Sequence, residues 1–107
     1  MVSFQDFKKT ELRAAEIVSV EDILGKDRLY KMVIDFGDEK RQIVAGLKGH
    51  YQKEELLGKK IIAVANLEHA KIAGISSEAM LLAAKNRGGK YKVVEIDESV
   101  QPGTFVE

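Results

Sequence analysis

The stretch from Tyr30 to Phe36 is the feature that most restricts the fold, because every second residue in it is apolar or aromatic. This set is Tyr30, Met32, Ile34 and Phe36. A period of two places alternate side chains on opposite faces of a β-strand. The pair Gly37-Asp38 and a second run from Arg41 to Ala45 come next, so the sequence predicts a β-hairpin with one buried face.

Other apolar runs predict strands on either side of this hairpin. The three longest are Leu12–Val20, Lys60–Asn66 and Met80–Ala84. In the first run the apolar residues change parity, so we expect a β-bulge near Ala15 and Glu16. The other two are apolar enough for strands that are buried on both faces. Short additional strands are expected in Tyr91–Ile96 and Thr104–Val106, after turns at residues 86–89 and 102–103.

Helical composition in Tyr51–Leu57 predicts a helix of about two turns between the third and fourth strands. Gly58 suits the left-handed residue that ends a helix, and Ser3 is expected to cap a short helix through Lys8. This order of elements is that of an OB-fold, a five-stranded barrel that usually binds oligonucleotides or oligosaccharides. We therefore expect an all-β OB-fold with a short helix between strands 3 and 4 and extra C-terminal strands.

The composition limits the kind of protein. A chain of 107 residues with 45% hydrophobic content is expected to form one domain over residues 1–107. Because there is no cysteine, and His50 and His69 lack a nearby ligand cluster, we expect no metal and no cofactor. No signal peptide or membrane span is apparent, which indicates a cytoplasmic protein without membrane contact. Neither a phosphate-binding loop nor a nucleophile elbow is present, so we expect no catalytic activity.

The net charge is zero, but the charges are unevenly distributed. Residues 40–92 carry eleven basic and four acidic side chains, whereas residues 1–39 carry six and nine, and residues 93–107 carry none and four. A basic middle segment can neutralise the phosphates of a nucleic acid. It can equally be a solvated surface whose counter-charges fold alongside it.

Polar residues are concentrated in Asn66–Ala84, between two apolar runs. The spaced residues Asn66, Lys71, Gly74, Ser77 and Met80 precede Leu-Leu-Ala-Ala, and further blocks occur in order at Glu11–Ala14, Asp27–Lys31, Asp35–Gly37, Lys40–Leu47, Glu54–Lys59 and Val64–Leu67. Over about residues 4–106 the sequence resembles the tRNA-binding domain found at the C-terminus of many methionyl-tRNA synthetases and in free-standing dimeric tRNA-binding proteins. Several separated blocks are more specific than one motif.

The resemblance implies an OB-fold that binds tRNA by shape and backbone, as a homodimer, either alone or as an accessory to the catalytic subunit of a methionyl-tRNA synthetase. The residues expected at the RNA are Arg28, Lys31, Lys40, Arg41, Asn66, Lys71, Ser77 and Met80. Each also has a structural alternative. The cations can be ordinary surface charges, Asn66 and Ser77 can hold turns, and Met80 can fill the core.

The sequence departs from the family pattern at three places. His69 stands where proline is common, Ala73 where a basic residue is common, and Glu78-Ala79 where Gln-Gly is usual. These changes remove rigidity or positive charge from the segment. A related group with this fold, described as export-associated and chaperone-like, also has a Ser-Glu pair after Ala-Gly, so polypeptide binding is the competing function.

Overall fold

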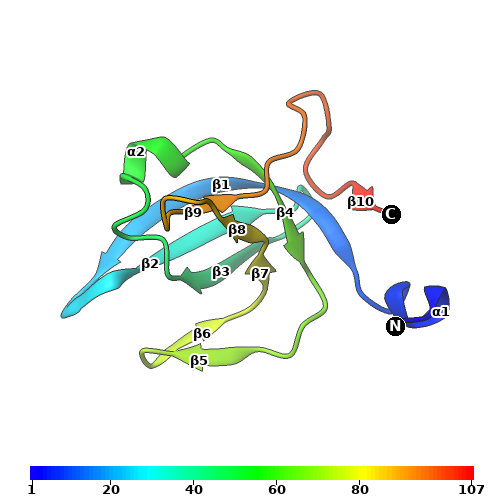
Figure 1. The fold of residues 1–107 in the computed structure, drawn as a ribbon, viewed down its shortest axis with the longest axis horizontal. Helices are drawn as coiled ribbons and strands as arrows, with labels where there is room; N and C mark the ends of the chain where they lie inside the picture. Colours follow the sequence, from blue (N-terminus) through cyan, green and yellow to red (C-terminus); the bar gives the residue numbers. More distant parts are fainter.

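A computed structural model describes all 107 residues and shows an antiparallel sheet around one apolar core (Figure 1). Five strands are hydrogen-bonded in the order β3-β2-β1-β4-β7, and β10 pairs with β1. The six strands are β1 (Leu12–Ile23), β2 (Lys26–Asp35), β3 (Lys40–Ala45), β4 (Lys60–Val64), β7 (Met80–Leu81) and β10 (Phe105–Val106). The expected all-β fold is confirmed.

The remaining elements are two hairpins and two short helices. The strand pairs are β5 (Ala70–Ile72) with β6 (Ile75–Ser77), and β8 (Ala83–Lys85) with β9 (Tyr91–Val93). Helix α1 (Phe4–Phe7) begins after Ser3, whose hydroxyl accepts a hydrogen bond from the Asp6 amide at 3.1 Å. Helix α2 (Lys53–Leu56) lies between β3 and β4 as predicted, but it has one turn instead of two.

The predicted β2–β3 hairpin is confirmed, with Tyr30 opposite Ala45 and Asp35 opposite Lys40. Its alternating residues from Tyr30 to Phe36 are all buried in the core. The Tyr30 hydroxyl donates to the Tyr51 carbonyl at 2.8 Å, which satisfies the one polar group that this face buries. The hairpin therefore supplies much of the apolar interior.

The predicted bulge in β1 is misplaced. The register shifts between Ile17 and Ser19, not near Ala15 and Glu16. Ala14 and Ala15 are both buried, so the strand needs no change of parity there. The reason is that β1 has neighbours along both edges in this region: β4 pairs from residue 12 to residue 16, while the C-terminal segment is hydrogen-bonded to Ala14 through Gly103 and Thr104.

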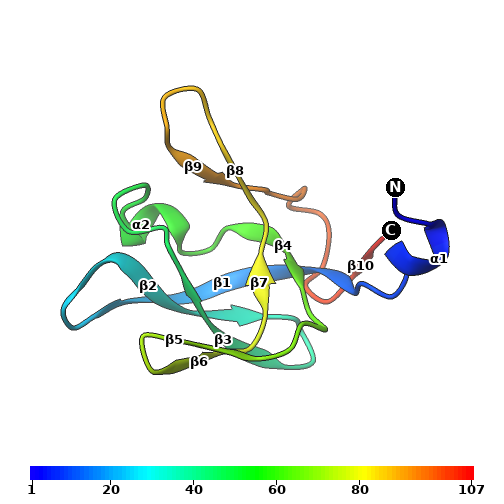
Figure 2. The ribbon, with the colours of Figure 1, turned by 60° about the horizontal axis from the view of Figure 1, so that its bottom comes forward.

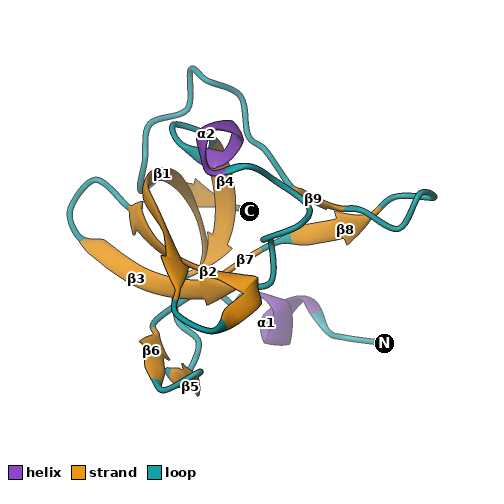
Figure 3. Ribbon diagram, turned by 90° about the vertical axis from the view of Figure 1, so that its left-hand side faces the viewer, coloured by secondary structure: helices purple, strands orange, loops and turns teal.

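The strand predicted for Met80–Ala84 is interrupted after Leu81, and its expected burial on both faces is wrong. β7 ends there, and β8 begins at Ala83 and pairs with β9 instead. Met80 is 53% exposed, and the β8 residues are exposed as well. The β8–β9 hairpin projects from the body of the molecule (Figures 2 and 3).

The edge strands β3 and β7 share no ladder, and the segment before β7 bridges the space between them. The Ser77 hydroxyl accepts a hydrogen bond from the Val44 amide at 3.1 Å. The Glu78 amide donates to the Gln42 carbonyl at 2.9 Å, and the Gln42 amide donates to a Glu78 carboxylate oxygen at 3.0 Å. Two of these three hydrogen bonds use a side chain, so side chains help to join β3 to the segment before β7, where few backbone groups pair.

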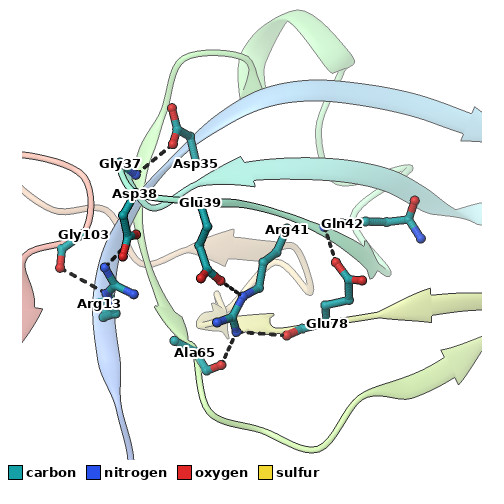
Figure 4. Close-up of polar contacts among 10 residues, drawn as sticks. All are labelled: Arg13, Asp35, Gly37, Asp38, Glu39, Arg41, Gln42, Ala65, Glu78 and Gly103. Carbon is teal, nitrogen blue, oxygen red and sulfur yellow. Dashed lines mark hydrogen bonds and ion pairs between the residues drawn. The ribbon is translucent and has the colours of Figure 1, made fainter.

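Arg13 joins the C-terminal segment to the β2–β3 turn (Figure 4). Its guanidinium donates to the Gly103 carbonyl and to Asp38, both at 3.1 Å, and it lies over the Phe36 and Phe105 rings. Gly103 has a φ of +93°, and a Cβ at this position would collide with the Phe36 carbonyl oxygen. Only glycine allows the two segments to approach so closely.

We predict that Ser77→Ala lowers the free energy of unfolding by about 1–3 kcal/mol, because the buried Val44 amide loses its acceptor. Urea denaturation would measure this change. Ser76→Ala is the matched control, because the Ser76 hydroxyl makes no hydrogen bond. This substitution should change the free energy of unfolding by less than about 0.5 kcal/mol. Equal stability of the two variants would contradict the bridging role of Ser77.

We also predict that Ala73→Asn stabilises the protein. Ala73 (φ 54°) and Gly74 (φ 78°) form the two-residue turn between β5 and β6, and asparagine tolerates this left-handed conformation better than alanine. The expected gain is about 0.5–1 kcal/mol, visible as a higher midpoint in a thermal melt. Ala70→Asn, in the extended β5 strand, should give no gain; a gain there and none at residue 73 would refute the strain argument.

Candidate nucleic-acid interface

The structure brings only some of the expected RNA-contacting residues together. Lys40, Arg41 and Asn66 line an open hollow of about 680 Å³ beside the loop that follows β4. The same hollow is lined by four carboxylate side chains, those of Glu11, Glu39, Glu68 and Glu78. Because carboxylates repel phosphate, the hollow as a whole attracts an RNA backbone less than its cations alone would.

Arg41 points into the protein (Figure 4). Its guanidinium is hydrogen-bonded to Glu39 and to the Ala65 carbonyl, lies 3.4 Å from the Glu78 carbonyl oxygen and covers the Phe36 ring. Its side chain is only 23% exposed. The fork that could bind a phosphate is therefore already occupied by groups that join β3 to the segments around Ala65 and Glu78.

Asn66 and Ser77 also use their polar atoms within the protein. Asn66 accepts a hydrogen bond from the Glu11 amide at 2.7 Å and donates one to the Lys9 carbonyl at 2.6 Å. Ser77 is 7% exposed, and its hydroxyl is held between Val44 and Ala79. These contacts favour the structural alternative for both residues, with Asn66 fixing the N-terminal segment instead of a local turn.

Four of the expected residues remain available at the surface. Arg28, Lys40 and Lys71 are exposed and form no ion pair, and the Met80 side chain is exposed on β7. Lys31 is half-exposed on the outer face of β2, as its parity predicted, but its ammonium lies 3.4 Å from Glu21. The freely accessible cations are thus fewer than the sequence suggested.

Two other lysines of the basic middle segment share one carboxylate as their ion-pair partner. Asp22 lies 2.8 Å from the Lys48 ammonium and 2.7 Å from that of Lys53. Hydrogen bonds from Lys48 and then Lys53 lower the pKa of Asp22 below its ordinary value, so the carboxylate stays charged. This group fits the surface reading of the charge pattern, in which counter-charges fold alongside.

The β8–β9 hairpin carries cations that the sequence reasoning did not single out. They are Lys85, Arg87, Lys90 and Lys92, all exposed and none in an ion pair. The signal was present in the sequence, because residues 79–94 contain no acidic side chain. It was averaged into the charge of the whole middle segment.

An apolar groove of about 370 Å³ lies between β3 and this hairpin. Nine of its ten lining residues are apolar, among them Ile43 and Leu81. Met80 and Tyr91 contribute exposed side chains, and the Lys85 ammonium lies 5.1 Å from the centre of the Tyr91 ring. Such a groove can take up an unstacked base or an apolar side chain of a polypeptide.

Two kinds of feature are not found in the structure. No group of three or more His, Cys, Asp or Glu side chains is placed to hold a metal ion. None of the helices has the length and apolar character needed to cross a membrane.

Comparison with known proteins gives the family of the chain. The family model described as "Putative tRNA binding domain" matches residues 12–105. A methionine-tRNA ligase from Methanocaldococcus jannaschii is 44% identical over 99 residues, which make up 92% of this chain. The chain spans only 15% of the length of that ligase.

Two solved structures share the whole fold. A MetRS-related protein from Pyrococcus horikoshii superposes with a TM-score of 0.93 at 34% identity, covering 100% of this chain and 98% of that one. The CsaA chaperone protein from Picrophilus torridus superposes with a TM-score of 0.90 at 33% identity, covering both chains fully. Together with the match over residues 12–105, these relatives show that the chain belongs to the tRNA-binding domain family.

Proposed function

We propose that this chain binds tRNA through its shape and backbone and catalyses no reaction. The observation that carries the proposal is the match to the tRNA-binding domain family over residues 12–105, on a fold whose exposed cations include several without a carboxylate partner. A folded RNA presents phosphates, 2′-hydroxyls and a few unstacked bases, and unpaired cations beside an apolar groove suit all three. The function places the protein in the cytoplasm, where tRNA is used.

Three cations are proposed to contact phosphates on the face that OB-folds commonly use. In this fold that face comprises β2, β3 and the loop that connects β4 to β7. Arg28 lies on β2, Lys40 begins β3, and Lys71 lies on the β5–β6 hairpin of that loop. Each is exposed without an ion pair, so its charge is free to replace condensed counterions on RNA.

The relatives suggest a partner as well. Because the similar segment of the methionine-tRNA ligase is about one seventh of that enzyme, we propose that the chain acts either alone or as an accessory to a methionyl-tRNA synthetase catalytic subunit. Extra tRNA contact from an accessory domain would raise the effective concentration of tRNA at a catalytic site on the same assembly.

A second copy of the chain is the other proposed partner. Phe4, Phe7 and Phe105 are exposed and line a hollow of about 550 Å³ between the two termini. Helix α1 buries none of its residues in the single chain, so its aromatic side chains stay largely exposed there. Covering this apolar surface with the same surface of a second copy would give a symmetric homodimer.

Polypeptide binding is the second candidate function, and the apolar groove beside Met80 favours it. The similarity to a protein named as a chaperone gives it further support. The salt dependence of binding separates the two functions. A polypeptide-binding protein would retain a permanently unfolded polypeptide in high salt, whereas binding to tRNA would weaken as salt rises.

For the proposed RNA face, we predict that Arg28→Gln with Lys40→Gln and Lys71→Gln lowers the salt dependence of tRNA binding. Each lost phosphate contact should reduce the slope of log affinity against log salt by roughly 1. Filter binding of bulk tRNA over a salt series measures this. Lys9→Gln with Lys53→Gln and Lys59→Gln removes the same formal charge at lysines that are ion-paired within the protein, and it should leave the slope nearly unchanged.

If wild-type protein bound an unfolded polypeptide but no tRNA, the proposed function would be wrong. If wild-type protein bound tRNA and both triple variants had its slope, the function would stand and the assignment of Arg28, Lys40 and Lys71 would fail.

For the dimer, we predict that light scattering gives about twice the chain mass of 11.9 kDa for the wild-type protein. Phe4→Ser with Phe105→Ser should yield a monomer, because it removes apolar contact area from the proposed interface. Leu24→Ser is the control, since Leu24 is fully exposed at the β1–β2 turn, away from both termini. A monomeric wild-type protein at tens of micromolar would refute the dimer.

A further inference from the structure

The β8–β9 hairpin concentrates positive charge in a way that no other part of the fold does. Four cations lie within eight residues, from Lys85 to Lys92, and the nearest acidic residues along the chain are Glu78 and Glu95. The hairpin also stands out from the body of the protein (Figures 2 and 3), and all four cations are exposed. A projecting cationic ribbon of this kind produces a strong local field even though the whole protein is neutral.

The base of the hairpin is fixed to the loop that precedes α2. The Lys90 ammonium donates to the Gly49 carbonyl at 2.8 Å. The Tyr91 amide donates to Nδ1 of His50 at 3.0 Å, and the Val93 amide donates to the Tyr51 hydroxyl at 3.1 Å. Its tip is closed by Asn86, whose side chain accepts from the Lys90 amide at 2.9 Å. These contacts hold the ribbon in place before any ligand binds, which lowers the entropic cost of binding.

The cations lie on both faces of the ribbon and at its tip. Lys85 is directly opposite Tyr91, so the two side chains share the face that borders the apolar groove. Lys92 is opposite Ala84 and takes the other face. Arg87 lies in the turn between the strands. An element charged on two faces can contact two phosphate strands at once, as at a bend or groove of a folded RNA.

The hollow beside Asn66 carries a different balance of charge from the β8–β9 hairpin. There, four carboxylates accompany two cations, and Arg41 is already engaged within the protein. Electrostatic attraction to phosphate should therefore be weaker at that hollow than at the hairpin. The exposed Met80 and Tyr91 side chains at the neighbouring groove add an apolar and aromatic surface on which a base can stack.

We infer that the β8–β9 hairpin is the main electrostatic contact of this protein with RNA, with Lys85, Arg87 and Lys92 on phosphates and the Met80–Tyr91 groove taking an unstacked base. The inference rests on the proposed tRNA-binding function and assigns its principal contact. Lys90 contributes charge but mainly positions the ribbon through Gly49.

The test compares Lys85→Gln with Arg87→Gln and Lys92→Gln against the control variant at Lys9, Lys53 and Lys59. Bulk tRNA is the probe, and affinity is measured over a salt series with the full chain. The hairpin variant should bind about 10- to 100-fold more weakly at roughly 0.1 M salt and lose about 2 to 3 units of slope. The control should change affinity by less than about threefold.

A charge-preserving variant, Lys85→Arg with Arg87→Lys and Lys92→Arg, separates charge from folding. It should bind tRNA within about threefold of the wild-type protein, while the glutamine variant binds about 10- to 100-fold more weakly with an unchanged melting temperature. Wild-type binding together with an unaffected glutamine variant would overturn the hairpin assignment alone. Absence of wild-type binding would instead overturn the proposed function. Equal competition by poly-glutamate would show an acidic polypeptide surface as the ligand and would also overturn the assignment.

Discussion

The fold depends on β1, because this one strand is hydrogen-bonded to three others. It pairs with β4 and β10 near its start and with β2 over most of its remaining length. Two consecutive buried alanines, Ala14 and Ala15, let neighbouring segments pack closely where these pairings meet. The irregularity after Ile17 comes just beyond Glu16, where the pairing with β4 ends. A long strand shared in this way holds both ends of the chain to one core.

Local sequence was sufficient for elements that one periodicity controls. The alternation from Tyr30 to Phe36 predicted the β2–β3 hairpin and its buried face, because period and turn agreed. Local sequence was insufficient for Met80–Ala84, because an apolar run of this length suits one continuous buried strand as well as the interrupted strand that is observed. The pairing of β8 with β9 decides that region, and this contact depends on residues six to ten positions away.

The site was less predictable than the fold, since a polar residue looks the same in sequence whether it faces solvent or another segment. Ser77 and Asn66 carry the right chemistry for RNA, yet their partners are Val44 and Glu11, more than thirty residues away. Burial and these long-range hydrogen bonds are absent from a single sequence. Exposure of Lys71 and the outer-face position of Lys31 were the easier inferences, because strand parity and loop composition indicate them directly.

Zero net charge is compatible with RNA binding because the fold separates its charges. Glu95 from the acidic C-terminal segment pairs with Lys59, and the carbonyls of Glu98 and Val100 hold the Lys60 ammonium. Asp22 forms ion pairs with two further lysines. The acidic groups in these pairs lie near the sheet and α2, whereas the β8–β9 hairpin contains no acidic residue. Coulomb attraction falls with distance and with screening over about 10 Å, so a phosphate at the hairpin responds to that local excess and not to the average over the chain.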